Sequence, residues 1–204
     1  MYKLPKLQYN YQDLEPYIDT HTLGLHYNVH ENNYLSKLNE LLEKNNYDYR
    51  YNIDELIFHL NEFRSNDTED ILYNLGGVLN HNLYFKSMND PKSCQRPFGS
   101  LLLAIEREFG SFDNFYDKFM DNALKIRGSG YTFLVLSSNG RLMILNLANQ
   151  QTPLSLGYIP LFCVDMWEHA YYLNYEPDKT KYLDNFKKVA DFTYANTIYN
   201  NIIK

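Results

Sequence analysis

Cysteine is scarce in this chain, and its scarcity excludes a disulfide-stabilised secreted fold. Two cysteines occur in 204 residues, Cys94 in a polar loop flanked by prolines and Cys163 in an apolar run. Cysteines in such different surroundings do not form a disulfide framework, and they are typical of a reducing compartment. The first residues also lack the apolar core of a signal peptide. These two absences together predict a cytoplasmic protein.

Long apolar runs and an excess of basic residues are missing as well. No stretch approaches the roughly 18 consecutive apolar residues of a membrane-spanning helix, so we expect no membrane partner. Lys and Arg number 19 against 25 Asp and Glu, which gives a net charge of −6. A general nucleic-acid binder neutralises phosphates with many basic side chains, so we expect no nucleic-acid partner either.

Tyrosine is the most conspicuous residue among those that are present. The chain has 20 tyrosines but a single tryptophan, and hydrophobic residues make up 45% of it. A chain of this length and composition can bury a core without cross-links. Because a buried tyrosine needs a partner for its hydroxyl group, the composition predicts an interior with many side-chain hydrogen bonds.

Apolar residues recur at helical spacing through most of the chain. Their period and the helix-start signals, including an acidic first turn at Asp67, predict the helices. The expected helices span residues 20–44, 53–63, 67–85, 98–109 and 111–125, and helices return from 178 to the end. A polar stretch with two prolines, 87–97, is the best candidate boundary. We therefore predict an N-terminal helical hairpin domain at 1–90 and a C-terminal domain at 91–204.

The helical pattern is interrupted after the fifth expected helix, where the chain reads as a small β-sheet. Residues 131–137 and 142–147 are apolar and partly β-branched, and a turn with Asn-Gly at 139–140 joins them. Asn-Gly between two such runs is a strong hairpin signal. A third strand is expected at 161–165. Helices followed by a small antiparallel three-stranded sheet that carries further helices describe an α+β fold.

Asp165 and His169 form the first candidate pair of metal ligands. They lie four residues apart, beside the only tryptophan, Trp167, and His169 follows a second acid, Glu168. Asp and His at this spacing can bind one metal ion if the backbone turns both side chains to the same side. The pair alone is an incomplete site, so other parts of the chain have to supply partner ligands.

Histidines on two of the expected long helices are the candidate partners. His26, His30 and Tyr34 follow one another at four-residue spacing, so their side chains share a helix face. His81 stands on another helix, one turn after Gly77. A small residue at that position lets another group approach closely, or it simply eases contact between helices.

A single histidine on a helix is by default a core or surface residue, and His21 and His59 have no companions. Only the combination of imidazoles from two helices with Asp165 and His169 favours a metal site. Three imidazoles and one carboxylate suit iron, manganese or zinc, and they leave coordination positions open. Spacing alone leaves both the existence of the site and the choice of metal undecided.

The chain resembles the iron/manganese superoxide dismutases over nearly its whole length. The matching motifs occur in the family's order and spacing, and the motif at 165–172, Asp-Met-Trp-Glu-His-Ala-Tyr-Tyr, is highly specific to it. The other matching segments are 4–9, 14–18, 25–34, 80–81, 128–131 and 148–150. The fold that this resemblance implies, an N-terminal helical hairpin followed by an α/β domain, agrees with the pattern of expected elements.

The resemblance also implies a metal site and an activity. The implied activity is the conversion of superoxide to oxygen and hydrogen peroxide by alternating reduction and oxidation of one manganese or iron ion per subunit. Manganese is favoured, because Gln150 together with Gly77 is commoner in the manganese enzymes. The implied ligands are His26, His81, Asp165 and His169.

Five further residues receive roles from the same resemblance. His30 and Tyr34 match the pair that guards the substrate channel, with Tyr34 also relaying protons. Gln150 matches the glutamine that hydrogen-bonds the metal-bound solvent. Glu168 matches the acid that reaches across a homodimer interface to a ligating histidine of the partner, and Tyr172 matches the residue that meets the partner's His30. The implied partners are therefore superoxide and a second copy of the chain.

The chain departs from the family's usual residues at several positions, none of which is a ligand position. Val29 stands where a lysine often helps to steer the substrate, which predicts slower capture of an anion by a chain of net charge −6. Tyr131 and Phe85 stand where tryptophan is usual, so we expect a smaller and more polar aromatic wall around the metal. Histidine is frequent at the positions of Tyr27, Glu31 and Val78.

Two alternatives stay open at the level of the sequence. A different metalloenzyme, such as a metal-hydroxide hydrolase or a non-haem iron oxygenase, uses related ligands, although an oxygenase typically shows two histidines and one carboxylate. An inactive homologue that binds metal only structurally would have no need of His30, Tyr34 and Gln150. Metal content and the activities of iron-loaded and manganese-loaded protein distinguish these alternatives from a dismutase.

Overall fold

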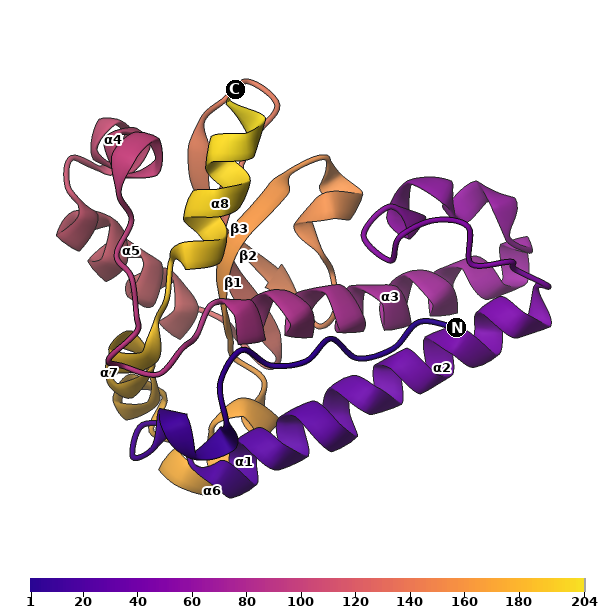
Figure 1. Ribbon diagram of the computed structural model, residues 1–204, viewed down its shortest axis with the longest axis horizontal. Helices are drawn as coiled ribbons and strands as arrows, with labels where there is room; N and C mark the ends of the chain where they lie inside the picture. Colours follow the sequence, from indigo (N-terminus) through magenta and orange to yellow (C-terminus); the bar gives the residue numbers. More distant parts are fainter. Residues whose placement is uncertain (204) are drawn as a thin grey trace.

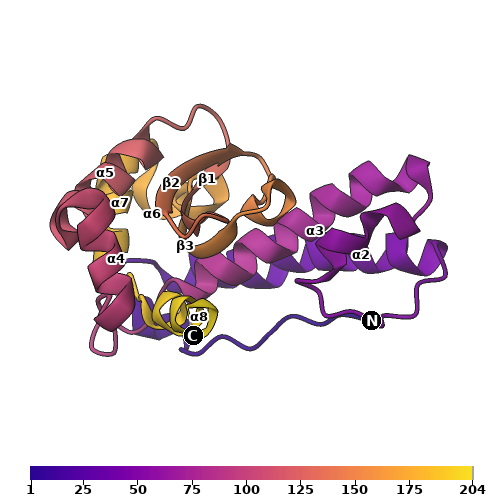
Figure 2. The ribbon, with the colours of Figure 1, turned by 90° about the horizontal axis from the view of Figure 1, so that it is seen from above.

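The computed structural model describes residues 1–203. Two long helices, α2 (Asn32–Lys44) and α3 (Ser65–Lys86), lie side by side and extend away from the rest of the molecule in both views (Figure 1 and Figure 2). The sheet and most of the remaining helices lie at one end of this hairpin. The base of the hairpin is therefore where the two halves of the chain meet.

The helix predicted at residues 20–44 is present, but it is not uniformly α-helical. It consists of α1 (Thr20–Leu25), a π-helical stretch η2 (His26–Glu31), and then α2. A π-helical turn is wider than an α-helical turn, and such stretches often occur at functional sites. This stretch begins with His26 and contains His30, so it sets the direction of both imidazoles.

Two adjacent glycines in the middle of α3 are explained by close approaches of other segments. A Cβ atom on Gly77 would lie 2.5 Å from Cγ of Tyr34 on α2. A Cβ atom on Gly76 would lie 2.1 Å from the carbonyl oxygen of Gln150. Both distances are too short for any side chain, so the prediction that a small residue here admits another group is confirmed.

A three-stranded antiparallel sheet forms the centre of the C-terminal half. Its strands, in the order β2-β1-β3, are β1 (Gly130–Leu136), β2 (Leu142–Ala148) and β3 (Ile159–Asp165). Every residue of the central strand β1 is buried. The pairing of β1 with β2 confirms the predicted hairpin, and Gly140 takes a positive φ of 78° at its turn. The register pairs Tyr131 with Asp165, which places Asp165 at the end of the sheet nearest the hairpin.

Helices cover the sheet. In Figure 2, α4, α5 and α7 stand together on one side of the sheet, and α3 crosses it on another. Helices α3 and α8 pack against β3, whereas α5 packs against β1 and β2. The bounds of these helices are α4 (Gly99–Phe109), α5 (Phe112–Leu124), α7 (Lys179–Val189) and α8 (Thr193–Ile202).

Five short elements complete the chain, and one of them corrects a prediction. They are η1 (Tyr11–Leu14), η3 (Leu56–Glu62), η4 (Pro153–Leu156), η5 (Glu168–Ala170) and α6 (Tyr172–Tyr175). The helix predicted at 53–63 is the shorter 3-10 helix η3, because His59 takes the non-helical angles φ −119° and ψ 20° and interrupts the turn. Helix α3 also begins at Ser65, slightly before the predicted start at Asp67.

Two apolar cores hold these elements together. The smaller core lies between the hairpin helices and includes Leu38, Leu42 and Leu75, whereas the larger core surrounds the sheet and includes Phe133 and Phe162. The predicted fold class is confirmed as an N-terminal helical hairpin followed by an α/β domain with a small antiparallel sheet. Within residues 1–203, no helix has both the length and the apolar content needed to cross a membrane.

Candidate metal centre

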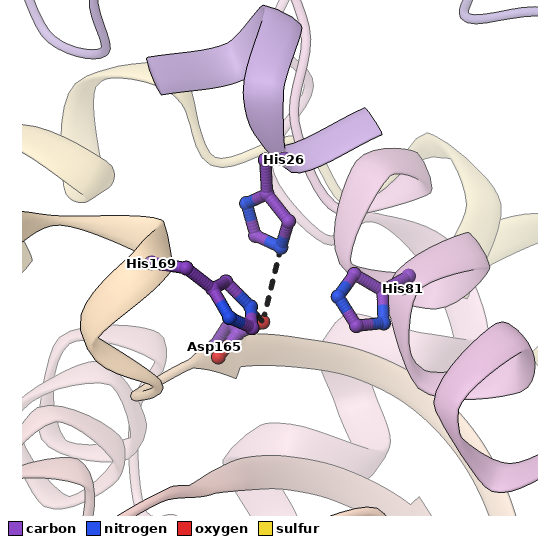
Figure 3. Close-up of side chains that lie close together, drawn as sticks. All are labelled: His26, His81, Asp165 and His169. Carbon is purple, nitrogen blue, oxygen red and sulfur yellow. Dashed lines mark ion pairs between the residues drawn. The ribbon is translucent and has the colours of Figure 1, made fainter. Parts of the chain in front are cut away.

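Four side chains from four separate segments converge at the base of the hairpin. They are His26 from η2, His81 from α3, Asp165 from the end of β3 and His169 from η5. One nitrogen or oxygen atom from each lies within 4.8 Å of the corresponding atoms of the other three. Figure 3 shows all four side chains pointing toward a common centre. The structure thus brings together the combination that spacing alone left undecided.

The atoms that face this centre have no hydrogen-bond partner among residues 1–203. The Nε2 atoms of His26, His81 and His169 and the Oδ2 atom of Asp165 are all buried and unpartnered. Asp165 Oδ2 approaches Nε2 of His26 to 3.3 Å and Nε2 of His169 to 3.4 Å without hydrogen-bond geometry. A buried polar atom without a partner costs about 1–3 kcal/mol. A cation among these four atoms would satisfy all of them at once.

Hydrogen bonds on the outer side of the ligands fix their orientation. His81 Nδ1 lies 2.6 Å from the Gly77 carbonyl oxygen, so Nδ1 carries the proton and Nε2 presents its lone pair to the centre. The Trp167 amide donates to Asp165 Oδ1 at 2.7 Å, which leaves Oδ2 facing inward. The Tyr182 hydroxyl donates to the Asp165 carbonyl oxygen at 3.0 Å. These bonds hold two of the four ligands in position before any ion is bound.

The electrostatics of the cluster favour neutral imidazoles beside an ionised carboxylate. Burial, assisted by His169, lowers the pKa of His26 to about 4. Burial likewise holds the pKa of His81 well below its ordinary value. Burial alone would raise the pKa of Asp165, but the close approach of His169 and His26 outweighs burial and lowers the pKa. Because His26 is neutral at physiological pH, its approach to Asp165 is not an ion pair there.

This donor set fits a first-row transition metal. Neutral imidazole nitrogen suits manganese, iron and zinc alike, and a carboxylate oxygen favours a harder divalent or trivalent ion. Four protein ligands with inward lone pairs leave room in the coordination sphere of manganese or iron for a further small molecule. The geometry therefore supports a metal site that can react as well as bind.

Gln150 and Tyr34 lie together beside this cluster. Gln150 is 2% exposed, and its Nε2 atom donates to the Tyr34 hydroxyl oxygen at 3.1 Å. Asn80 Nδ2 donates to Gln150 Oε1 at 3.4 Å and to the Gln151 carbonyl oxygen at 3.1 Å. The Tyr34 ring in turn lies 5.4 Å from the His81 ring, measured between centroids. A chain of hydrogen bonds thus runs from Asn80 through Gln150 to a phenol at the edge of the cluster.

His30 contacts the cluster at a different ligand, His169. Its ring stacks on the His169 ring with centroids 4.2 Å apart and an interplanar angle of 23°. The side chain is half-buried, and burial together with His169 lowers its pKa. His30 contacts a candidate ligand without pointing a lone pair at the centre, so it belongs to the surroundings of the site.

Glu168 and Tyr172 are not part of the cluster within one chain. Both side chains lie on the surface, and Tyr172 is 47% exposed. Glu168 is the first residue of η5, the turn that carries His169, and Tyr172 is the first residue of α6. Any role for them at a metal centre therefore requires a second molecule.

Aromatic side chains surround the cluster at the expected positions. Phe85 lies 5.1 Å from His26 between ring centroids, and the Tyr131 hydroxyl lies 3.4 Å from His81 Nδ1. The phenol of Tyr131 therefore reaches the outer nitrogen of His81, at a position where tryptophan is usual in the family that the chain resembles.

Sequence reasoning missed several residues that shape the site. Tyr182 and the Trp167 amide orient Asp165, and Asn80 orients Gln150. Asn80 could have been suspected because it precedes His81. Nothing local in the sequence marks Tyr182, because its partner is reached only through the fold.

Comparisons with known proteins agree with this geometry. The model of the iron/manganese superoxide dismutase α-hairpin domain matches residues 1–89, and the model of the C-terminal domain of the same family matches residues 97–198. A manganese superoxide dismutase of Listeria innocua is 40% identical over 195 residues, which is 96% of each chain. One from Thermus aquaticus is 35% identical over 198 residues, 97% of each chain. A protein of Bacillus anthracis named manganese superoxide dismutase 2 is 34% identical over 203 residues, covering 100% of this chain and 97% of that one.

Proposed function

The chain belongs to the iron/manganese superoxide dismutase family, and we propose that His26, His81, Asp165 and His169 hold the metal ion on which its activity depends. The protein is a superoxide dismutase that converts superoxide to oxygen and hydrogen peroxide. One manganese or iron ion per subunit is its cofactor, and the matching relatives carry manganese in their names. The observation that supports the ligand assignment is the set of four unpartnered, inward-facing atoms.

The four ligands prepare the site for an anionic substrate. When bound, the ion supplies the redox chemistry by alternating between the +3 and +2 states, so that one superoxide is oxidised and the next is reduced. Three imidazoles and one carboxylate do not cancel the charge of such an ion, so the site keeps a net positive charge that attracts superoxide. Asp165 and His81 are held in place from behind, by the Trp167 amide and the Gly77 carbonyl group.

Tyr34 and Gln150 are the residues to which we assign proton supply. Reduction of superoxide to hydrogen peroxide consumes protons, so the site needs a donor that remains protonated at neutral pH. Burial is the largest influence on Tyr34 and raises the pKa of its hydroxyl group above the ordinary value. Gln150 holds the same hydroxyl oxygen at 3.1 Å. Tyr34 therefore keeps a proton close to the centre and in a fixed direction.

His30 and Tyr34 are also proposed to guard the approach to the centre. Each is half-buried, and each ring lies against the ring of one ligand, His30 against His169 and Tyr34 against His81. A small anion that passes between them meets the unpartnered atoms of the cluster. A larger organic molecule would have to displace one of these two rings.

We further propose that two copies of the chain form a homodimer through the surface around η5. Glu168 and Tyr172 are exposed there, and the neighbouring Leu173 is 60% exposed. In the dimer Glu168 reaches His169 of the partner subunit, and Tyr172 reaches the partner's His30. This arrangement would give each centre an acid that the single chain does not supply.

The domain division and the location in the cell are proposals of the same kind. A division at 1–90 and 91–204 is supported by the two family models, which leave a gap between residues 89 and 97. A cytoplasmic location is supported by the two cysteines, both of which are free. Limited proteolysis tests the division, and fractionation of cells that express the protein tests the location.

Metal content and activity of the same samples test the proposed function. Separate preparations loaded with manganese, iron and zinc should each bind about one ion per chain, and only the manganese or iron form should consume superoxide. Zinc is the control, because it fits the ligands but does not change oxidation state. Metal bound without activity in both the manganese and the iron form would contradict the proposal.

A further inference from the structure

A second cavity, separate from the proposed metal ligands, lies between the start of α5, the end of α7 and the segment that leads into α4. Its volume is about 190 Å³, and its lining includes three aromatic rings and two basic side chains. Arg96 Cζ lies 4.4 Å from the centre of the Phe112 ring, and Lys187 Nζ lies 5.0 Å from the centre of the Tyr116 ring. The centroids of these two rings are 5.8 Å apart. Because a cation is attracted to the face of an aromatic ring, both charges are held beside the same pair of rings.

The positive charge of this cavity is largely free to act on a ligand. Lys187 forms no ion pair with any of residues 1–203. Arg96 pairs with Asp113 at 3.0 Å through one nitrogen, but the two side chains are 69% and 82% exposed, so water screens the pair. A guanidinium group has five N–H donors, and most of those of Arg96 remain available. Two cations and one acid therefore line this cavity in a chain whose net charge is −6.

The hydroxyl group of Tyr116 is the third feature that points to an anion. Tyr116 is 2% exposed, and its hydroxyl group has no hydrogen-bond partner among residues 1–203. Burial raises the pKa of this phenol well above its ordinary value, so the group keeps its proton and can donate a hydrogen bond. A buried polar group without a partner is unfavourable. An anion attracted by Lys187 to the same ring would supply the missing acceptor.

The size and the lining of the cavity restrict which anion fits. A volume of 190 Å³ corresponds to about six water molecules at about 30 Å³ each, and it is below the roughly 300–1,000 Å³ of pockets that hold drug-sized ligands. A nucleotide is therefore too large. The rings of Phe112 and Phe192, whose centroids are 5.5 Å apart, favour a flat apolar body, and the basic groups favour a carboxylate.

We propose that this cavity binds a small aromatic carboxylate. The carboxylate group lies between the side chains of Lys187 and Arg96 and accepts a hydrogen bond from the Tyr116 hydroxyl group. The ring of the ligand packs against Phe112 and Phe192. None of the residues that line the cavity is a proposed metal ligand, so the inference goes beyond the proposed function and does not depend on it.

Calorimetric titration of the manganese-loaded protein with benzoate tests this proposal. Benzoate has one aromatic ring and one carboxylate group, and we expect one to bind per chain with a Kd on the order of 1 mM, as is usual for a ligand of so few atoms. Benzyl alcohol keeps the ring without the charge, and inorganic phosphate keeps the charge without the ring. Both should bind at least about tenfold more weakly. Absence of saturable benzoate binding, or equal binding of either control compound, would overturn the proposal.

Two lysine variants show whether benzoate occupies this cavity. Lys187→Gln removes one charge from an exposed side chain and should weaken benzoate binding about fivefold. Lys188→Gln is the matched control, because Lys188 is also exposed on α7 but does not line the cavity. Equal losses of affinity in the two variants would show that benzoate responds only to the net charge of the protein, which contradicts a site at Lys187.

Tyr116→Phe tests the assigned hydrogen bond and removes only the unpartnered hydroxyl group. No hydrogen bond within residues 1–203 is lost, so the free variant should unfold at a temperature equal to or above that of the unchanged protein. A ligand that binds the folded state raises Tm, and benzoate should raise it less in the variant. Equal increases in Tm for the variant and the unchanged protein would refute the role of Tyr116.

Discussion

At the scale of single residues, the surroundings of Glu31 disfavour the charged form of its carboxyl group. It is fully buried, and neither of its carboxylate oxygens has a hydrogen-bond partner among residues 1–203. Burial, opposed by Lys86, raises its pKa from 4.5 to about 8. The folded protein therefore keeps the Glu31 carboxyl group protonated over a range of pH in which the unfolded chain releases the proton. As a result, the stability of the fold falls as the pH rises from about 4.5 to about 8.

Glu31→Gln should remove this pH dependence, because an amide of the same shape cannot ionise. We expect little change in the free energy of unfolding near pH 5 and a stabilisation of a few kcal/mol at pH 8, at about 1.4 kcal/mol per unit of pKa shift. Denaturant unfolding at the two pH values measures the difference. Glu40→Gln is the matched control, since that side chain is 65% exposed. Equal gains at both pH values would show that Glu31 is not the titrating group.

At the scale of single elements, α3 combines a structural weakness with a functional requirement. Glycine inside a helix costs about 1 kcal/mol relative to alanine, and α3 has two of them in succession. The helix tolerates them because Gly77 admits the Tyr34 ring and Gly76 admits the Gln150 backbone. The arrangement of the proton-carrying groups therefore depends on the absence of two methyl groups.

Gly77→Ala should destabilise the protein despite the better helix propensity of alanine. The new Cβ atom would lie 2.5 Å from Tyr34, and such overpacking typically costs about 1–3 kcal/mol. Displacement of Tyr34 should also lower kcat. Gly24→Ala in α1 is the control, because its Cβ atom would meet the Tyr11 ring at an ordinary 3.6 Å and should leave the stability unchanged or slightly raised. Thermal unfolding of both variants measures the contrast, which disappears if Tyr34 moves aside without cost.

The elements also show what the sequence could predict. Hydrophobic period and turn chemistry located the long helices and the hairpin at Gly140, because both signals are local. The same period could not reveal the π-helical stretch that begins at His26, since a change of hydrogen-bond register over one turn leaves the apolar pattern intact. Local spacing suggested the four candidate ligands but left the site undecided. The placing of the Tyr34 ring against Gly77 depends on how the two hairpin helices pack, which no local pattern encodes.

At the scale of the whole molecule, charge and assembly decide how substrate arrives and how the site is completed. The chain carries a net charge of −6, and superoxide is an anion, so local positive charge has to overcome long-range repulsion. Val29 is 42% exposed on the π-helical stretch that carries His30, so a lysine placed there would add a surface cation next to a residue that we propose guards the centre.

Val29→Lys should therefore increase kcat/KM, by a factor that shrinks as salt is added, because screening weakens steering over about 10 Å at 0.1 M ionic strength. Stopped-flow measurements of superoxide decay at low and high salt test this expectation. Val29→Gln is the control for polarity without charge. A rate for Val29→Lys equal to that of the unchanged enzyme at low salt would refute the steering role.

Glu168→Ala tests the proposed dimer. If Glu168 holds His169 of the partner subunit, its removal should weaken both association and metal retention. Sedimentation equilibrium and metal analysis of the same sample measure the two effects. Glu176→Ala, on the surface beyond α6, is the control for loss of one negative charge. An unchanged dimer that retains its metal would exclude the bridging role.

The proposed ligands come in equal numbers from the two halves of the chain, His26 and His81 from the hairpin and Asp165 and His169 from the α/β part. A bound ion would thus link the two halves, which are otherwise joined by the connection at residues 87–97 and by packing. The ion binds only when the two halves of the chain lie together, so metal in solution increases the free energy needed to separate them. A protease that attacks the connection should cut unloaded protein faster. A shortage of metal would then shorten the lifetime of the protein as well as lower its catalytic rate.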